Sequence, residues 1–294
     1  MESRKIEIYN SLFFQTCSKK FLADKFSVSI KTIENTIKTC DDINYSKKLG
    51  KYHFKDLLPK YISYKNYFSI FKENFSNLIL KKDMLKVTKQ MNSNFSDCMI
   101  NTMKLSTLSK KMIRTSIAMH HNCVLKVSYK GNKKNREIKY IQPNQIFIIG
   151  SVYYLALTYD KKNKKNIGEE RTFAFNSLED IEPSEYLNDA IFKTDISRNA
   201  FGSYRNAKEI RLRLTDAAAN YFTREGLFEN ESYTFITQES SQEIEIKMLY
   251  NDRLEVVKLI QHWMPQIKLI DISDEATKIC EDIKNNFLSF IETS

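Results

Sequence analysis

Four polar residues in the segment from residue 30 to residue 38 have the types and the spacing that contact nucleic acid. The segment reads IKTIENTIK, and Ile30, Ile33 and Ile37 recur at the helical period, so we expect these isoleucines to face inward. The opposite face then carries Lys31, Thr32, Asn35 and Lys38. Asparagine and lysine contact base edges and phosphates, so this face predicts binding to a DNA groove.

A second basic feature follows in the segment INYSKKLGKYHF, residues 43–54. Alternating residues on both sides of Gly50 predict a hairpin, and its tip would hold Lys47, Lys48 and Lys51. Lysines at such a tip can lie along minor-groove phosphates and add affinity that does not depend on sequence. We therefore interpret the hairpin as the wing of a winged helix-turn-helix.

Three short helices would position these basic groups. Apolar spacing predicts a first helix over about residues 4–15 and a second over residues 21–26, and Ser29 is placed as the N-cap of the third. Ala23 is small enough to let the second and third helices cross, and Val28 would fill the turn. A three-helix bundle can show the same short turn, so the interpretation depends on the wing and the charge as well.

The positive charge is concentrated in the first part of the chain. Residues 1–120 hold 22 Lys and Arg against 10 Asp and Glu, whereas residues 191–294 hold 13 against 17, within a total net charge of +10. This asymmetry favours contact between the N-terminal part and a polyanion. The alternative is that lysine is merely the favoured surface residue of this Lys-, Asn- and Ile-rich chain.

Residues 61–118 read as a lysine-rich helical connector with a candidate joint at residues 91–97. Its apolar stripe, which we interpret as core or as a face for a partner helix, consists of Phe68, Phe71, Phe75, Leu78 and Leu80.

From residue 123 the apolar period changes to two. Four or five short strands with turns at residues 130–132, at Pro143-Asn144 and in the polar loop 161–170 predict a small β-barrel. Within it Tyr153 and Tyr154 must point to opposite faces of one strand. We expect one of the two to pack in the core and the other to line a pocket floor beside Tyr129.

The order of these pieces resembles the WYL domain of bacterial transcriptional regulators. Tyr153-Tyr154-Leu155 stands where that family has Trp-Tyr-Leu, and the segment Arg171-Thr172-Phe173 matches its Arg-x-Phe strand. Ser177 stands where many members have a second arginine, which puts one anion contact in doubt.

This resemblance implies an Sm-like or SH3-like barrel that senses a ligand derived from nucleic acid. The residues that would hold the ligand are Ser128, Tyr129, Arg136, Tyr153, Tyr154 and Arg171. Guanidinium groups pair with phosphate, tyrosine rings stack on bases and serine adds a hydrogen bond. Each residue also has an ordinary structural role open to it: an arginine can pair with a carboxylate, and a tyrosine can fill a core.

Residues 208–290 read as β-α-β-β-α-β, the order of ferredoxin-like domains, and look like the C-terminal extension of the WYL family. The predicted fold class is therefore α+β and multidomain. Its segments are a winged helix-turn-helix over residues 1–60, the connector over 61–118, the WYL barrel over 119–190 and a dimerising extension over 205–294.

Other classes of protein find little support in the sequence. Five scattered cysteines without a CxxC pair argue against a disulfide framework or a zinc ribbon, and the four histidines lie in no known catalytic motif. Six glycines form no phosphate loop or dinucleotide fingerprint. We expect no enzyme activity, no cofactor, no metal, no membrane span and a cytoplasmic location.

The sequence thus predicts a homodimeric transcriptional regulator, with repressor as the first hypothesis. Its expected partners are a double-stranded DNA operator and a nucleotide or oligonucleotide effector. The alternative is an accessory protein that binds single-stranded nucleic acid or a partner enzyme without recognising a promoter.

Overall fold

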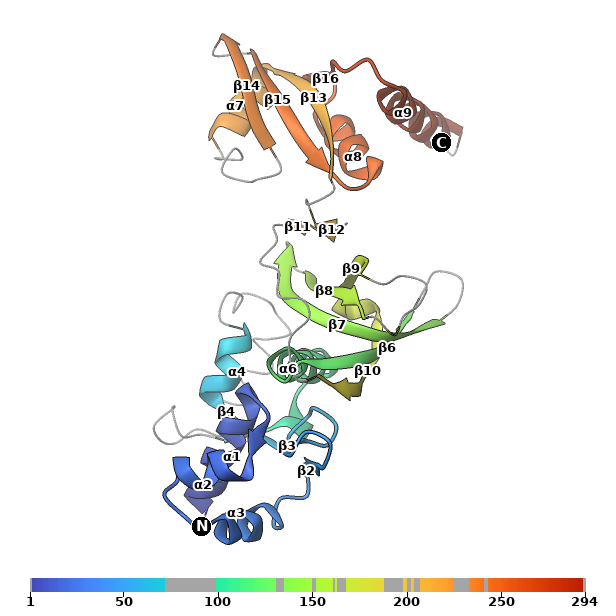
Figure 1. Ribbon diagram of the computed structural model, residues 1–294. Coiled ribbons are helices and arrows are strands. Elements are labelled where there is room, and N and C mark those ends of the chain that lie inside the picture. Colours follow the sequence, from blue (N-terminus) through green and yellow to red (C-terminus); the bar gives the residue numbers. More distant parts are fainter. Residues whose placement is uncertain are drawn as a thin grey trace. The chain divides into compact units, whose positions relative to one another are not determined.

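The computed structural model divides the chain into two compact units, residues 1–194 and 195–294 (Figure 1). The predicted segments 1–60, 61–118 and 119–190 fall in the first unit, and 205–294 falls in the second. The residues that the structure describes are 2–71, 99–130, 135–149, 152–160, 162, 168–187, 198–199, 202–203, 207–224, 233–240 and 243–292.

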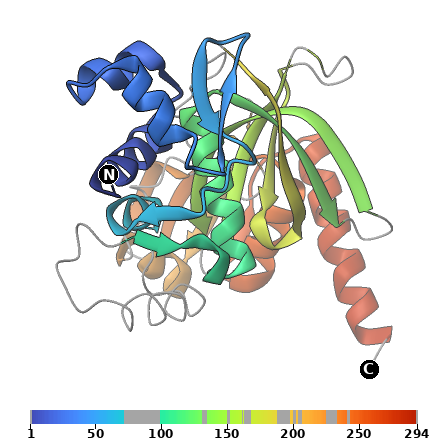
Figure 2. The same ribbon diagram turned by 90° about the horizontal axis from the view of Figure 1, so that it is seen from below.

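The first unit begins with three helices and a small antiparallel sheet of strand order β1-β3-β2. The helices are drawn in blue in Figure 2. The elements are α1 (Glu2–Phe14), β1 (Cys17–Ser18), α2 (Lys19–Lys25), α3 (Ile30–Ile37), β2 (Ile43–Ser46) and β3 (Lys51–Phe54). The predicted helices and hairpin are present in this order. Gly50 closes the hairpin with a φ of 64°, a conformation in which glycine has no steric cost.

One inward-facing residue was predicted wrongly. Ile33 and Ile37 of α3 are buried, but Ile30 is 45% exposed. Ile30 is the first residue of the helix, directly after the N-cap Ser29, so it lies before the turn that packs on α1 and α2.

The connector contains strand as well as helix. Its described elements are β4 (Tyr61–Ser63), α4 (Tyr64–Phe71), β5 (Met99–Asn101), the 3-10 helix η2 (Thr102–Lys104) and α6 (Thr107–His120). β4 pairs with β5 antiparallel, so the two ends of the connector lie side by side. Phe71 is buried and Phe68 is 38% exposed. Phe75, Leu78, Leu80 and the candidate joint 91–97 lie outside the described residues.

Five antiparallel strands follow in the order β10-β6-β7-β8-β9. They are β6 (Cys123–Lys130), β7 (Asn135–Ile149), β8 (Val152–Tyr159), β9 (Glu170–Ala174) and, after the 3-10 helix η3 (Phe175–Ser177), β10 (Leu178–Tyr186). The turn predicted at Pro143-Asn144 is wrong. β7 runs through these residues, and its pairing with β8 shifts register between Pro143 and Gln145, which is a β-bulge.

The sheet is curled but is not a closed barrel in the part that the structure describes. The edge strands β9 and β10 pair only with β8 and β6 respectively. Yet the rings of Tyr129 on β6 and Phe173 on β9 lie 5.0 Å apart. In a flat sheet these strands would be about 14 Å apart, at three strand spacings, so the sheet must bend to bring the rings together.

A single hydrophobic cluster runs through the first unit, from Ile8 in α1 to Ile181 in β10. α6 packs on β6, β7 and β10 with one side and on α1 and α4 with another (Figure 1). Tyr186, at the end of β10, donates a hydrogen bond of 3.1 Å to the carbonyl oxygen of Phe54 in the wing strand β3. The helix-turn-helix and the curled sheet therefore share one core.

The second unit has the predicted connectivity. Its elements are β11 (Arg198–Asn199), β12 (Gly202–Ser203), β13 (Lys208–Thr215), α7 (Asp216–Arg224), β14 (Tyr233–Ser240), β15 (Glu243–Tyr250), α8 (Arg253–Trp263), β16 (Ile267–Leu269) and α9 (Asp274–Glu292). The four main strands form an antiparallel sheet of order β14-β15-β13-β16. This β-α-β-β-α-β order is ferredoxin-like. Among the helices described in both units, none is both long and apolar enough to span a bilayer.

Candidate nucleic-acid interface and ligand face

Helix α3 is held so that one side remains free for a ligand. Ser29 caps it, its side chain accepting a hydrogen bond of 3.1 Å from the backbone N–H of Thr32. Ile33 and Ile37 are buried at 0% and 7% exposure and anchor the inner side. Short contacts across the turn, such as Val28 N–H to the Ala23 carbonyl at 3.0 Å, fix the helix against α2.

The outer side carries the predicted recognition residues. Lys31, Asn35 and Lys38 are exposed. Thr32 is half-buried, and its hydroxyl lies 2.8 Å from the hydroxyl of Ser29, so part of its hydrogen-bonding capacity is used at the N-cap. The structure therefore brings three of the four predicted side chains to the surface of one helix, where lysine and asparagine can contact phosphate and base edges.

Sequence reasoning missed a charged group at the base of this helix. Lys19, at the start of α2, forms an ion pair of 2.6 Å with Glu34 of α3, and its ammonium also lies 4.6 Å from the ring centroid of Tyr45 in the wing. The hydrogen bond raises the pKa of Lys19 and lowers the pKa of Glu34. The lysine thus offsets the negative charge of this carboxylate on α3. Fifteen residues separate the partners, so no local pattern signals the pair.

The wing lysines differ in their surroundings. Lys47 is exposed in the turn, and Lys51 is half-buried in β3. Lys48 is 79% exposed and forms an ion pair of 3.2 Å with Glu185 of β10, which also pairs with Lys162. These hydrogen bonds, that of Lys162 first, lower the pKa of Glu185. A phosphate that contacts Lys48 must therefore compete with a carboxylate of the curled sheet.

The two adjacent tyrosines do point to opposite faces. Tyr153 is 5% exposed on the core face with Leu155 and Leu157, and burial raises its pKa to about 12. Tyr154 is half-buried on the other face, where its ring stacks on Phe147 at 5.6 Å. Phe173 pairs in register with Leu155, so the tyrosine on the side of Tyr129 and Phe173 is the buried Tyr153. The expectation that the other tyrosine lies beside Tyr129 is therefore wrong, because Tyr154 is on the opposite face of the sheet.

The other predicted ligand residues are only partly brought together. Arg136 lies opposite Tyr129 in the pairing of β6 with β7, but its side chain lies outside the described part. Arg171 is 56% exposed and pairs with Glu169 at 2.9 Å. Ser128 is half-buried and alternates with Tyr129, so it lies on the opposite face of β6. The six residues thus divide between both faces of the sheet.

The adjacent histidines at the end of α6 are structural in their contacts. The Nε2–H of His121 donates to the carbonyl oxygen of Leu12 in α1, and burial lowers its pKa to about 4. His120 is exposed and lies 5.3 Å from the ring of Phe14. Among the described residues, no three His, Cys, Asp or Glu side chains are grouped closely enough to hold a metal ion.

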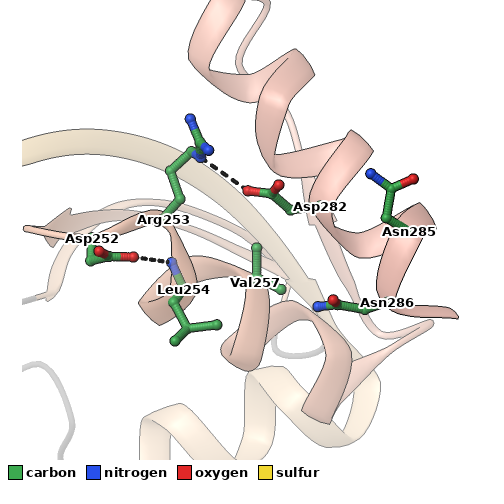
Figure 3. A pocket seen from close by; sticks show the side chains of 7 residues that line it. All are labelled: Asp252, Arg253, Leu254, Val257, Asp282, Asn285 and Asn286. Carbon is green, nitrogen blue, oxygen red and sulfur yellow. Dashed lines mark hydrogen bonds and ion pairs between the residues drawn. The ribbon is translucent and has the colours of Figure 1, made fainter. Parts of the chain in front are cut away.

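The second unit has a small hollow of about 280 Å³ between the start of α8 and α9 (Figure 3). Two of its polar groups already have partners within the unit. Asp252 accepts from the Leu254 N–H at 2.8 Å and Arg253 pairs with Asp282 at 3.0 Å. These contacts cap α8 and join it to α9, which explains their presence without a ligand.

Comparison with known proteins gives only distant similarities. No protein-family model and no curated protein matches the chain. Among solved structures, proteasome accessory factor B/C (PafBC) of Arthrobacter aurescens is similar at 11% identity and a TM-score of 0.31 over 92% of this chain. The chain spans 45% of the length of that protein. A CRISPR Cas-related protein is similar at 11% identity and a TM-score of 0.38, over 77% of each chain. At TM-scores below 0.5 neither similarity decides the fold or the function.

Proposed function

We propose that the chain is a DNA-binding transcriptional regulator of the WYL type, acting as a homodimeric repressor in the cytoplasm. The observation that carries this proposal is the exposed side of α3, where Lys31, Asn35 and Lys38 project while Ile33 and Ile37 anchor the helix. A lysine-bearing wing follows it, and the first 120 residues have a net charge of +12. A recognition helix, a wing and a local positive charge together are the features of a groove-binding module.

The second part of the proposal is that the curled sheet senses a nucleotide or oligonucleotide. Support comes from Tyr129 and Phe173, whose rings lie together, and from Arg136 opposite Tyr129 in strand register. The shared core and the Tyr186–Phe54 hydrogen bond give the sheet a direct contact with the wing strand. A ligand that favours one arrangement of sheet and wing would shift operator affinity by its differential affinity for the two states. We propose no catalytic role for the chain.

The alternative is an accessory protein that binds single-stranded nucleic acid or a partner enzyme. Aromatic residues beside basic ones, as at Tyr129 opposite Arg136 in strand register, are also the means by which single strands are bound without sequence preference. The two functions differ in one measurable property. A promoter-binding protein prefers its site over competing duplex DNA by several orders of magnitude, whereas a single-strand binder depends on strand length.

The test is a gel-shift titration of the full chain on duplex DNA from upstream of its own coding sequence, with scrambled duplex and single strands as competitors. The variant Lys31→Ala with Asn35→Ala should weaken the specific complex about tenfold or more, because each good base contact contributes about 1–3 kcal/mol of discrimination. Lys104→Ala, an exposed lysine in η2, is the matched control and should bind like the parent. Unchanged binding by the folded double variant would exclude α3 as the recognition helix.

A further inference from the structure

The face of the sheet opposite the core carries a group of polar side chains that the function above does not use. In register across β7, β8 and β9, Gln142 pairs with Thr158 and Thr158 with Glu170. In the next row of the same face, Gln145 pairs with Ala156 and Ala156 with Thr172. Side chains two residues apart on a strand share a face, so these two rows form one surface.

The β-bulge at Pro143 assembles this surface. Without the bulge, Gln142 and Gln145 would lie on opposite faces of β7. The register shift places both on the same face of the sheet as Thr158 and Ala156. Asn144 is turned to the same face, since its Nδ2 donates a hydrogen bond of 2.5 Å to the Thr158 hydroxyl. Bulges recur beside functional sites because they re-aim side chains in this way.

The surface is polar and yet largely removed from solvent. Gln142, Thr158 and Asp160 are only 3%, 2% and 4% exposed, and they form its floor. Asp160 follows β8 two residues after Thr158, and its backbone N–H donates to the Tyr140 carbonyl at 2.8 Å, which continues the pairing with β7. Asn144, Gln145, Glu170 and Thr172 are half-buried, so the surface opens toward them.

Six buried oxygen atoms of this surface have no hydrogen-bond partner in the described part of the chain. They are Gln142 Oε1, Asn144 Oδ1, Gln145 Oε1, Asp160 Oδ2, Glu170 Oε2 and Thr172 Oγ1. A buried acceptor that remains unpaired is costly, and six on one face would remove a large share of a domain's stability. A satisfied native state therefore needs donors on this surface that the described residues do not supply.

The chemistry of the six groups defines the donor. An ionised carboxylate only accepts hydrogen bonds, whereas an amide or hydroxyl can accept or donate, so Asp160 and Glu170 set the requirement for a cationic donor. The acceptors are spread over three rows, because Asp160 lies one row beyond Gln142 and Glu170, so they span about 14 Å along the strands and about 10 Å across three strands. One metal ion needs its oxygen ligands at 2.0–2.6 Å from a single point, which three such rows do not offer, whereas a planar group with several N–H donors can bridge neighbouring acceptors such as Asp160 and Glu170.

We propose that this face, defined by Gln142, Asn144, Gln145, Asp160, Glu170 and Thr172, is a binding site for a guanidinium group. Guanidinium is planar, is charged at every physiological pH and presents five N–H donors in a fixed fork that matches carboxylates. The group would come from a small guanidine compound or from an arginine side chain of a protein. The site is independent of the DNA-binding face on α3.

The experiment is calorimetric titration of the full chain with arginine amide, with lysine amide at equal concentration as the probe for charge alone. Arginine amide should bind, and lysine amide should bind at least about tenfold more weakly because an ammonium lacks the planar fork. The tripeptide Gly-Arg-Gly identifies the source. Tighter binding of the tripeptide points to a protein arginine, and tighter binding of arginine amide points to a small compound.

Matched variants separate this face from its neighbours. Glu170→Gln and Asp160→Asn should each weaken arginine amide about tenfold or more, because a hydrogen bond to a charged group is lost. Glu169→Gln, next in sequence but exposed and paired with Arg171, should bind like the parent. Without ligand, Glu170→Gln should melt at the same temperature as the parent or higher, since it removes an uncompensated carboxylate. A lower melting temperature would mean that the chain's own donors already satisfy Glu170 and would overturn the proposal. Equal binding of both amides, or a response to Ca²⁺ alone, would do the same.

Discussion

His121, at the end of α6, donates a hydrogen bond from its ring Nε2–H to the backbone carbonyl oxygen of Leu12 in α1. The histidine is 3% exposed, Leu12 is fully buried, and the ring of Phe54 from the wing strand stacks over the imidazole at 6.3 Å. The other ring nitrogen, Nδ1, has no hydrogen-bond partner among the described residues. The helix-turn-helix is thus joined to the rest of its unit through a histidine that must stay neutral.

Acid should therefore destabilise the first unit through His121. Burial lowers its pKa from 6.5 to about 4, so between these values the unfolded chain binds the proton and the folded chain does not. The stabilisation from His121 is fully present above pH 6.5 and is lost as the pH falls toward 4, by up to about 3 kcal/mol. Urea unfolding of the parent and of His121→Gln, followed by circular dichroism from pH 7.5 to pH 4.5, measures this difference.

His121→Gln keeps a side-chain N–H donor and removes the titration, so its unfolding free energy should depend less on pH than that of the parent. His262→Gln, at an exposed histidine of the second unit, is the control variant. Fluorescence of Trp263, the single tryptophan, follows the second unit separately. An identical slope for parent and His121→Gln would show that the imidazole is not held neutral by the fold.

The two isoleucines on α3 should differ sharply in their effect on stability. Ile33 is fully buried, so Ile33→Ala leaves a cavity and should lower the free energy of unfolding by about 2–5 kcal/mol. Ile30 is 45% exposed, and Ile30→Ala should change it by no more than about 0.5 kcal/mol. Thermal unfolding of the two variants side by side decides this. An equal loss of unfolding free energy in the two variants would mean that Ile30 is buried in the core.

The ligand response should be separable from DNA binding. Arg136→Ala with Arg171→Ala should leave operator affinity nearly unchanged, because neither residue lies on α3 or in the wing. It should abolish induction in a reporter strain, since two phosphate-binding guanidiniums are lost. Arg171 pairs with the exposed carboxylate of Glu169, so replacing Arg171 by alanine should lower the free energy of unfolding only slightly. Arg211→Ala in the second unit is the matched arginine control. Normal induction by the double variant would remove the sensing role from this face.

Association should depend on the second unit. The end of α9 exposes Phe287, Leu288 and Ile291 at 62%, 46% and 55%, and such an apolar group of side chains favours contact with another chain. Light scattering should find a dimer for the full chain and a monomer for residues 1–194, which should also bind the operator more weakly because two half-sites are no longer held together. A folded 1–194 fragment that is still dimeric would place the interface in the first unit.

Local signals in the sequence were sufficient for most individual elements. The apolar period of Ile33 and Ile37, the N-cap Ser29 and the alternation in β15 each concern residues within one turn or strand, and the structure agrees with them. The strand alternation also separated Tyr153 from Tyr154 correctly. Ile30 was predicted wrongly because helical periodicity shows which side of a helix is apolar. It does not show how far along the helix other elements pack on that side.

Pairings between distant residues were beyond the sequence. β4 pairs with β5 across residues 64–98, and Lys19 pairs with Glu34 between two helices. Pro143 was taken for a turn because proline commonly begins one, whereas here it stays in register with Leu157 and the following residue forms a bulge. The curl that joins Tyr129 to Phe173 depends on the twist of the whole sheet. None of these features has a signature within a short window.

The continuous core of the first unit limits how this protein can be recombined with others. A chimera that exchanges residues 1–60 for a foreign winged helix would remove Leu12 and Phe54, the groups on which His121 and Tyr186 depend. In the chimera, the imidazole of His121 and the hydroxyl of Tyr186 would lose their hydrogen-bond acceptors at the boundary with the foreign segment. A foreign winged helix would fit only if it placed backbone carbonyls and an aromatic ring at the positions of Leu12 and Phe54. Lys31, Asn35 and Lys38 are exposed on α3, so substitutions there should leave this core intact.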